Sequence, residues 1–217
     1  MNTSDLRIVI VGGGRVGLLT AQRLDDRGHH ITLIEKNHAR CREIADEYVA
    51  TVIEGDATRP SILQQANLMR TDVIAGLTPY QGTNLSVCLL AKRHGAPIRT
   101  VLRREENHDD EYKDLVDAVI LPEAAGARMV ANAIEPGVQT LEDTVGELQV
   151  LILEVTNAAP AAGRTLSELA LPRGSLIVSG TDCHGVAEAD TTVESGCRYM
   201  IATEPAVEDE IIRLFRG

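Results

Sequence analysis

The sequence predicts an α/β fold in which a doubly wound parallel sheet is followed by a small α+β domain. Short apolar runs alternate with segments of helical periodicity over the first ~120 residues, as in folds built from βαβ units. A G-x-G-x-x-G motif at residues 12–17 follows the first apolar run directly and opens a helical pattern. Beyond residue 136, strand-like runs are more closely spaced and end in one amphipathic segment.

The first strand is expected at residues 6–11, an apolar run rich in β-branched residues. A helix follows as far as Gly28, and a second strand at 29–35 ends in Glu35. The same patterns predict later strands at 49–53, 72–75, 98–102 and 118–121, and helices at 39–47, 59–66, 80–94 and 123–134.

The chain is expected to divide into a sheet domain at 1–122, a crossover helix with linker at 123–137, and a small α+β domain at 138–217. Pro136-Gly137 and the polar stretch up to Glu147 are interpreted as linker. Thr165 and Glu168 have the spacing of a helix capping box. Strands of this domain are expected at 148–155, 175–179 and 198–202, a turn at 181–185, and a final helix through 207–215.

The glycine motif makes the first domain Rossmann-like. Its first glycine, Gly12, permits a tight turn, Gly14 lets the backbone approach a pyrophosphate, and Gly17 lets helix and strand pack closely. Unpaired amides at the start of the following helix then face the phosphates. The alternative is a glycine-rich turn that binds no ligand.

Glu35 stands 18 residues after Gly17, at the end of the second strand. A carboxylate at this place accepts hydrogen bonds from both hydroxyls of an adenosine ribose and repels a 2′-phosphate. The sequence therefore favours NAD(H) or plain adenine nucleotides over NADP(H).

Composition excludes several classes of function. The formal net charge of −11 and the 2% of aromatic residues argue against a nucleic-acid-binding protein. No apolar run approaches the ~20 residues of a membrane-spanning helix, and the first residues lack a signal-peptide pattern. We therefore expect a cytoplasmic protein without direct membrane insertion. Residues 136–217 carry 5 basic and 13 acidic side chains, so most of the negative charge belongs to the second domain.

The four cysteines, Cys41, Cys88, Cys183 and Cys197, form no C-x-x-C pair. Neither a disulfide framework nor a zinc site is expected, and the four are interpreted as structural or free thiols. His184 lies beside Cys183, but a metal site there needs two further ligands that the sequence does not place, so no metal site is predicted.

No catalytic residues are predicted. None of the four tyrosines has a lysine four residues later, and the G-x-S-x-G, HExxH and Walker A motifs are absent. About 80 residues after the sheet domain leave little room for a substrate domain. An NAD-dependent oxidoreductase is kept as the alternative, because one fold carries many activities.

Several motifs together resemble the TrkA/KTN (RCK) family. They are the loop 11–17 (VGGGRVG), Glu35, the run 55–58 (GDAT), the run 83–85 (TNL) and the run 121–123 (LPE). In the second domain, residues 163–169 (GRTLSEL) match the motif of the RCK C-terminal (TrkA-C) domain. A departure is Cys197, where the family usually has Asp in a Gly-Asp turn.

The resemblance implies a set of nucleotide-binding residues. Arg15 is expected to reach a terminal phosphate across a dimer interface, or else to face solvent at the helix start. Glu123 is a candidate ligand of a bound divalent cation, or else an acid favoured by the helix dipole. Arg103 is expected either to support a phosphate or interface, or to form a plain salt bridge. The full set is Gly12, Gly13, Gly14, Arg15, Val16, Gly17, Glu35, Lys36, Asp56, Ala57, Thr78, Arg103 and Glu123.

The resemblance also implies a function. The family consists of cytosolic nucleotide-sensing regulators, so this chain is expected to bind NAD(H) or ATP/ADP and to gate a membrane potassium transporter or channel subunit. It is expected to work at the inner face of the cell membrane, as a homodimer or higher homo-oligomer. A regulator of another cation transporter, such as a sodium–proton exchanger, is an alternative that the sequence does not separate.

Overall fold

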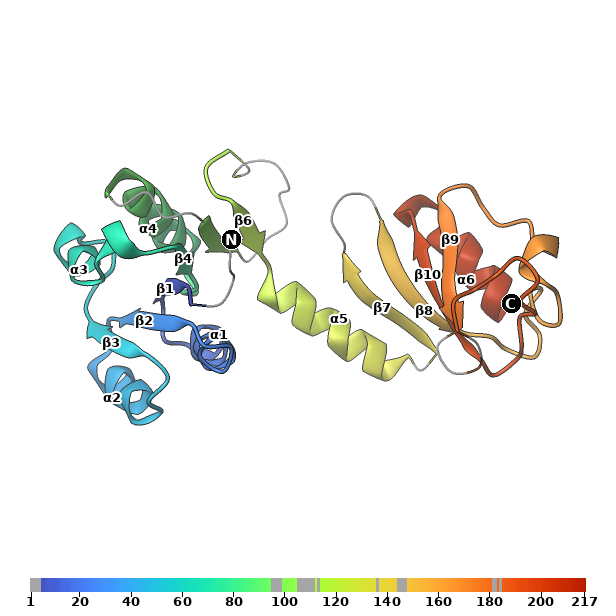
Figure 1. Cartoon of the computed structure of the whole chain (residues 1–217), viewed down its shortest axis with the longest axis horizontal. Helices are drawn as coiled ribbons and strands as arrows, with labels where there is room; N and C mark the ends of the chain where they lie inside the picture. Colours follow the sequence, from blue (N-terminus) through green and yellow to red (C-terminus); the bar gives the residue numbers. More distant parts are fainter. Residues whose placement is uncertain are drawn as a thin grey trace. The chain divides into compact units, whose positions relative to one another are not determined.

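A computed structural model of the chain describes residues 5–94, 99–104, 112, 114–135, 137–143, 148–180, 183 and 185–217 (Figure 1). The chain forms two compact units, residues 1–125 and 126–217. None of the helices in these described ranges is long and apolar enough to span a membrane.

The first unit contains a six-stranded parallel sheet with the strand order β3-β2-β1-β4-β5-β6. From β1 the chain adds β2 and β3 on one side of the sheet, and from β4 it adds β5 and β6 on the other side. The boundary between β1 and β4 is therefore the topological switch point, where doubly wound folds bind ligands. The strands are β1 (Arg7–Val11), β2 (His30–Glu35), β3 (Thr51–Glu54), β4 (Val73–Gly76), β5 (Arg99–Arg103) and β6 (Ala118–Ile120). The helices are α1 (Arg15–Asp25), α2 (His38–Asp46), α3 (Pro60–Gln65), the 3-10 turn η1 (Leu68–Arg70), α4 (Gln81–His94) and α5 (Pro122–Ile134), which continues into the second unit.

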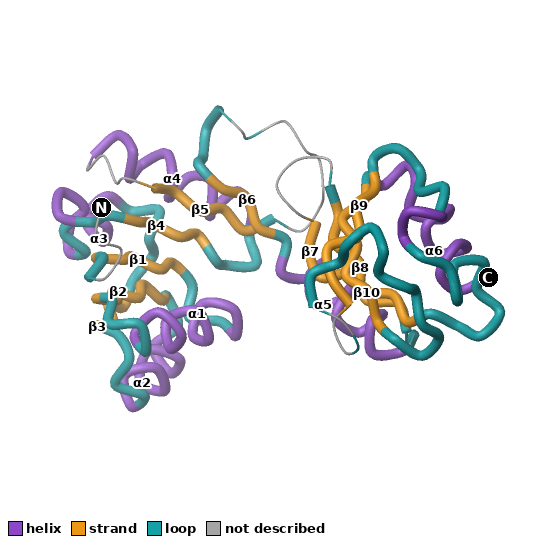
Figure 2. The backbone as a smooth tube through the Cα atoms, turned by 45° about the vertical axis from the view of Figure 1, so that its right-hand side comes forward, coloured by secondary structure: helices purple, strands orange, loops and turns teal. Residues whose placement is uncertain are grey.

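Helices cover both faces of this sheet, with α1 and α2 on one face and α3 and α4 on the other (Figure 2). Alternate residues of β1 serve the two faces: Ile8 and Ile10 pack with the α1 and α2 side chains, and Val9 and Val11 with those of α3 and α4. Burial on both sides explains the nearly continuous apolar strands in the sequence. The predicted Rossmann-like fold class is confirmed.

The helix expected at 59–66 is shorter in the structure. It ends at Gln65, and Asn67 adopts a left-handed conformation with φ of 53° before the turn η1 begins. Asparagine tolerates this conformation better than most residues, so it separates two short helical segments.

The second unit is a four-stranded antiparallel sheet with the order β7-β8-β10-β9. Helix α6 packs on one face, where Leu151, Leu153, Tyr199, Ile211 and Phe215 form a buried core. The described elements are β7 (Val138–Asp143), β8 (Gln149–Glu154), η2 (Leu166–Glu168), β9 (Ser175–Gly180), β10 (Arg198–Thr203), η3 (Pro205–Val207) and α6 (Glu208–Arg216). The expected α+β class of this unit is confirmed.

The interpretation of the stretch up to Glu147 as linker is wrong for 138–143, which form the edge strand β7 paired with β8. The strand is polar, with a register shift between Thr140 and Glu142, so its alternation is weak in the sequence. Backbone pairing with β8 holds the strand in the sheet. The Asn132 side chain adds two hydrogen bonds to the Thr140 backbone, of 2.8 Å and 3.1 Å. Residues 144–147 lie outside the described residues.

The expected capping box is confirmed at η2. The Thr165 amide donates to Glu168 Oε2 over 2.9 Å, and the Thr165 side chain accepts a hydrogen bond from the Glu168 amide. These hydrogen bonds hold the pKa of the Glu168 carboxyl below its usual value.

The interpretation of all four cysteines as thiols is wrong for two of them. Cys183 and Cys197 form a disulfide, with their Cα atoms 5.9 Å apart. No local pattern indicates this bond, because 14 positions separate the two cysteines and the antiparallel pairing of β9 with β10 brings them together. Cys41 and Cys88 are free and buried, as expected. His184, and with it part of the turn expected at 181–185, lies outside the described residues.

Candidate functional site

A cavity of about 480 Å³ lies at the carboxyl ends of the parallel strands of the first unit. Its volume falls in the range of ~300–1,000 Å³ that is usual for small-molecule sites. The lining comes from the segments that follow β1, β2, β3, β4 and β5: Val11, Gly12, Gly14, Ile34, Glu35, Lys36, Gly55, Asp56, Ala57, Thr58, Leu77, Thr78, Pro79, Tyr80, Thr83 and Arg103.

The glycine loop after β1 needs glycine at two positions for steric reasons. Gly12 has a φ of +104° and donates its amide to Ile34 O over 2.9 Å, which ties the loop to β2. A Cβ atom at Gly17 would lie 1.9 Å from Gly12 O, because α1 passes directly over the loop. The turn and the helix therefore fit together without side chains.

Gly14 differs from Gly12 and Gly17 because the space at its Cβ position is open. A Cβ atom here would meet nothing within 4 Å among the described residues, and Gly14 lines the cavity. It is also the N-cap of α1 and offers no side-chain hydrogen bond to the first amides of that helix. Amides at a helix start with free space in front of them suit a phosphate group.

The carboxylate of Glu35 is held by backbone amides on both oxygens. Gly13 N donates to Oε2 and Asn37 N donates to Oε1, each over 2.8 Å. Each oxygen keeps a further lone pair, so the carboxylate is oriented and can still accept from a ligand. This is the geometry expected of an acid that binds a ribose diol.

Arg40 was missed by the sequence analysis although it supports the same loop. Its Nε donates to Gly13 O over 2.7 Å, and its Nη1 pairs with Glu43 at 2.6 Å. The only sequence signal is an arginine one helical turn after Asn37, the N-cap of α2, and this spacing alone has no specific meaning.

Asp56 and Thr58 form the edge of the cavity that follows β3. Asp56 Oδ1 accepts from Thr58 N at 2.9 Å and from Thr58 Oγ1 at 2.7 Å. These hydrogen bonds, led by the hydroxyl, lower the pKa of Asp56, so the group is ionised at neutral pH. The neighbouring Ala57 is buried and contributes an apolar wall.

Lys36 and Tyr80 both line the cavity and contact each other. The Lys36 ammonium lies 5.0 Å from the centre of the Tyr80 ring, within cation–π range. Tyr80 is exposed and was not predicted as a site residue. An aromatic residue at this edge offers a surface on which a planar base can stack.

Asn84 joins the ends of β4 and β5 through hydrogen bonds to two residues of the cavity lining. Its side chain is fully buried, accepts from Thr78 N at 3.0 Å, and donates to Thr78 O and Arg103 O at 2.9 Å and 3.0 Å. In the sequence Asn84 is recognisable only as part of the TNL run at 83–85, and no role for it was predicted. A buried amide with all these partners fixes the two strand ends relative to each other.

Arg103 is the one arginine of the lining. Its Nη1 donates to Leu77 O at 3.3 Å, and its Nη2 forms a close ion pair with Glu123 Oε1 in the first turn of α5. The Arg103 side chain is 14% exposed, and among the described residues its buried Nε has no hydrogen-bond partner. A buried guanidinium with one free N–H suits an anionic ligand.

The thirteen residues predicted for the site separate into groups. Eight line the cavity: Gly12, Gly14, Glu35, Lys36, Asp56, Ala57, Thr78 and Arg103. Gly13 and Gly17 belong to the loop framework, Val16 packs in the core, and Glu123 is linked to the cavity through Arg103. Arg15 is exposed at the first turn of α1 and does not line the cavity, so its role stays a prediction.

Comparison with known proteins gives matches over most or all of the chain. Residues 8–122 match the TrkA-N domain. A Trk system potassium uptake protein TrkA homolog of Pyrococcus abyssi is 32% identical over 214 residues, covering 93% of this chain and 94% of the relative. The Trk system potassium uptake protein TrkA of Mycobacterium tuberculosis is 28% identical, covering 96% of this chain and 98% of that protein.

Solved structures agree on the fold. The GsuK RCK domain superposes with a TM-score of 0.62 at 15% identity, over 99% of this chain and 48% of that chain. The GsuK channel bound to NAD gives a TM-score of 0.61 at 15% identity, over 94% of this chain and 38% of that chain. This chain therefore spans about half or less of the length of those channel chains.

Proposed function

The chain belongs to the TrkA family of regulatory proteins of potassium uptake, and from this premise we propose that it is the nucleotide-sensing subunit of a Trk- or Ktr-type system. In this proposal the cavity of the first unit binds NAD(H) or ATP/ADP. The protein acts in the cytoplasm, at the inner face of the cell membrane, on a potassium transporter or channel subunit. It does so as a homodimer or higher homo-oligomer and without catalytic turnover.

The anchored carboxylate of Glu35 is the observation that carries the proposal. Two backbone amides, of Gly13 and Asn37, hold it at the wall of the cavity beside the glycine loop. A ribose with two free hydroxyls satisfies the remaining lone pairs, whereas a 2′-phosphate brings a second negative charge against the carboxylate. The predicted ligand is thus an adenine nucleotide without a 2′-phosphate.

The phosphates have two partners in this proposal. The open space at Gly14 and the first amides of α1 receive one phosphate, as in other dinucleotide-binding folds. Arg103, which also lines the cavity and whose Nε has no hydrogen-bond partner in the described part of the chain, is the second partner. Tyr80 and Ala57 supply surface for the base.

The ion pair between Arg103 and Glu123 suggests how ligand identity is transmitted. A ligand phosphate at Arg103 competes with Glu123 for the guanidinium, and a divalent cation on that phosphate instead attracts the carboxylate. Glu123 lies in the first turn of α5, which leads from the first unit into the second. Ligands that differ at this pair then favour different states in proportion to their differential affinity.

Two structures of a related channel support the choice of ligands. The GsuK channel, whose RCK domain has this fold, is known bound to NAD and bound to ADP. Both ligands carry an adenosine ribose with free hydroxyls, the group that Glu35 is proposed to bind.

Thermal unfolding of the purified chain with NAD, NADH, NADPH, ATP and ADP tests the proposal. A ligand at 100 times its dissociation constant adds ~2.7 kcal/mol of stability, enough to raise the midpoint visibly. We expect NAD(H) or ATP/ADP to stabilise the protein and NADPH to have no effect. Glu35→Gln should lose the effect.

Glu54→Gln is the matched control, because Glu54 ends the neighbouring strand β3, pairs with His38 and does not line the cavity. It should respond to nucleotides like the unmodified chain. Equal stabilisation by NADPH, or a Glu35→Gln variant that responds normally, contradicts the assignment of Glu35. No response to any nucleotide contradicts the proposed function itself.

A further inference from the structure

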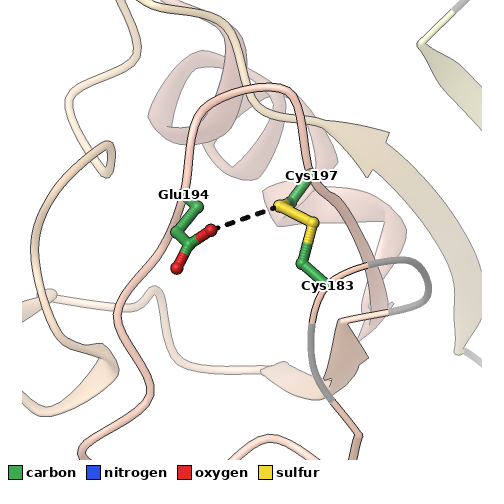
Figure 3. Close-up of side chains that lie close together, drawn as sticks. All are labelled: Cys183, Glu194 and Cys197. Carbon is green, nitrogen blue, oxygen red and sulfur yellow. Dashed lines mark hydrogen bonds between the residues drawn. A yellow bond between two sulfur atoms is a disulfide. The ribbon is translucent and has the colours of Figure 1, made fainter.

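The disulfide of the second unit lies beside a carboxylate (Figure 3). Glu194 Oε2 is 3.8 Å from Cys197 Sγ, and the ligand atoms of Cys183, Glu194 and Cys197 lie within 4.8 Å of one another. Among the described residues, this is the one group of three such side chains close enough to hold a metal ion.

From this arrangement we propose that, once the disulfide is reduced, Cys183, Cys197 and Glu194 bind one thiophilic divalent cation, with Zn²⁺ as the best fit. The proposal is independent of the nucleotide cavity, which lies in the first unit. Two thiolates and one carboxylate are donors that Zn²⁺ accepts in a tetrahedral site, with the fourth position left to water.

The distances agree with this donor set. With Zn–S of about 2.3 Å and Zn–O of about 2.0 Å, a tetrahedral ion needs sulfur and oxygen about 3.5 Å apart and the two sulfurs about 3.8 Å apart. The contact between Glu194 and Cys197 already has nearly the first of these separations. The two sulfurs reach a separation of about 3.8 Å when the disulfide is broken and one cysteine side chain rotates away from the other. This needs no backbone movement, because the Cα atoms are 5.9 Å apart.

The backbone holds two of the three ligands on one short turn. Cys197 N donates to Glu194 O at 3.3 Å across Ser195 and Gly196, and Gly196 has the positive φ of 82° that such a turn requires. The turn is tied to the end of β8, because Gly196 N donates to Val155 O at 2.8 Å and Val155 N donates to Cys197 O at 2.9 Å.

A second anchor positions Glu194 from the other side. Its amide donates to the hydroxyl of Tyr199 at 3.1 Å, and that hydroxyl donates to Thr192 O at 3.2 Å. The Tyr199 ring belongs to the buried core of the unit. A ligand turn that is fixed in this way loses little conformational freedom when a metal ion binds.

Charge also favours a cation in this unit. Residues 136–217 carry 13 acidic and 5 basic side chains, so this part of the chain has a net negative charge that attracts cations. Cys183 and Glu194 are exposed, which gives an ion access, whereas Cys197 is buried.

Reduction by a dithiol opens the site. One thiolate of the reductant attacks Cys183 Sγ, the S–S bond breaks, and its electron pair stays on Cys197 Sγ, which takes up a proton. The second thiolate of the reductant then attacks the mixed disulfide and releases Cys183, which also takes up a proton. The reductant leaves as a disulfide after giving up two electrons, and the metal ion later displaces the two thiol protons into solvent. A reducing compartment keeps the site in this open form.

The test uses the full chain, reduced and then freed of reductant without oxygen, and titrated with Co²⁺ as a spectroscopic probe for the Zn²⁺ site. We expect an absorption band from thiolate-to-cobalt charge transfer that saturates at one ion per chain and disappears when Zn²⁺ is added. The oxidised chain should give no band.

Variants identify the ligands. Cys183→Ser should abolish the band, and Glu194→Gln should weaken metal binding at least ~10-fold. Loss of a residue that only hydrogen-bonds to a metal ligand already costs ~10–100-fold in affinity, so loss of a ligand should cost no less. Two controls should bind like the unmodified chain. Glu188→Gln removes an equal charge from the same segment, and the double variant Cys41→Ser with Cys88→Ser removes the buried thiols of the first unit. Far-ultraviolet circular dichroism confirms that each variant is folded.

Three results would overturn the proposal. The first is a reduced chain without the charge-transfer band. The second is a band that survives Cys183→Ser or is lost in the double variant. The third is an equal loss of affinity in Glu188→Gln and Glu194→Gln, which would mean that only the general negative charge attracts the ion.

Discussion

The two units of this protein bury their sheets in different ways. The parallel sheet of the first unit is covered by helices on both faces, whereas the antiparallel sheet of the second is covered by α6 on one (Figures 1 and 2). Leu176 on β9 is 64% exposed on the other face, while Ile10 in β1 is fully buried. Parallel sheets need cover on both sides, and antiparallel sheets tolerate one open face.

The way in which each sheet is covered determines where the polar groups of the two candidate sites lie. In the first unit both faces are occupied, so the polar groups of the cavity lie where the strands end. In the second unit the Cys183, Glu194 and Cys197 side chains lie in connections between strands, beside the sheet. In both units the candidate binding groups therefore lie on loops that a buried sheet positions.

Substitution in the one-sided core of the second unit should lower stability most. Phe215 is fully buried in α6, with its ring centre 5.9 Å from that of Tyr199. Phe215→Ala should lower the free energy of unfolding of the second unit by about 3–5 kcal/mol, through lost burial and a cavity. Urea denaturation measures this. Leu176→Ala on the open face should change it by less than ~0.5 kcal/mol, and similar losses in both variants would contradict the one-sided core.

A pair of glycine substitutions tests the packing of the first unit. Gly17→Ala should cost ~3 kcal/mol or more, because its Cβ would lie 1.9 Å from the backbone oxygen of Gly12. Gly14→Ala should stay within ~1 kcal/mol, since none of the residues that the structure describes lies within 4 Å of its Cβ and its φ of −65° suits alanine. Thermal unfolding separates the two variants.

Nucleotide binding gives this pair a second measurement. Gly14→Ala should fold normally and still lose nucleotide binding, because its new methyl group points into free space at the wall of the cavity. Normal binding by Gly14→Ala would contradict the placing of a phosphate there.

Reduction of the disulfide should affect the second unit alone. A bond that closes a loop of this length contributes about 2–3 kcal/mol. We expect reductant plus chelator to lower the unfolding midpoint of the second unit and to leave the first unchanged, because Cys41 and Cys88 are free thiols. Cys183→Ser should resemble the reduced protein and ignore reductant. A shift of both units would mean that they unfold together.

The smallest effect concerns pH. Hydrogen bonds from Thr100, led by its hydroxyl, hold the pKa of Asp117 below its ordinary value of 3.8. Because the folded pKa is the lower one, Asp117 stabilises the protein above about pH 4, and this contribution is lost as pH falls through the folded pKa. Asp117→Asn should reduce the acid sensitivity of the first unit by less than ~1 kcal/mol, since the carboxylate is 42% exposed.

Denaturation at pH 3 and pH 6 measures this effect. Glu168→Gln offers the comparison in the second unit, where the Thr165 amide likewise lowers the pKa of the carboxyl. Asp117→Asn should leave the acid response of the second unit unchanged, and an identical response of both units to this variant would contradict the assignment.

The sequence predicted the first unit well because its signals are local. The strand before Gly12, the three glycine positions and the spacing to Glu35 each describe a short stretch of chain. Arg40, Tyr80 and Asn84 were missed because their contacts join segments from different strands. Such contacts leave no periodic pattern in the sequence.

The second unit was less predictable for a related reason. Strand β7 has a polar sequence, so its hydrophobic alternation is weak. Hydrogen bonds to β8 and to the Asn132 side chain hold it in place, and these contacts leave no pattern in the sequence. The Cys183 to Cys197 bond depends on the register of two antiparallel strands. The capping box at Thr165 was predictable because its two partners are three residues apart.

Hydrogen–deuterium exchange with and without saturating ADP or NADH reports on nucleotide binding at the cavity and on the response of α5 in one measurement. We expect slower exchange of the amides at residues 13–17 and altered exchange within 122–134, as the Arg103–Glu123 pair responds to the ligand. Unchanged exchange at 13–17 with every nucleotide would contradict nucleotide binding at the cavity.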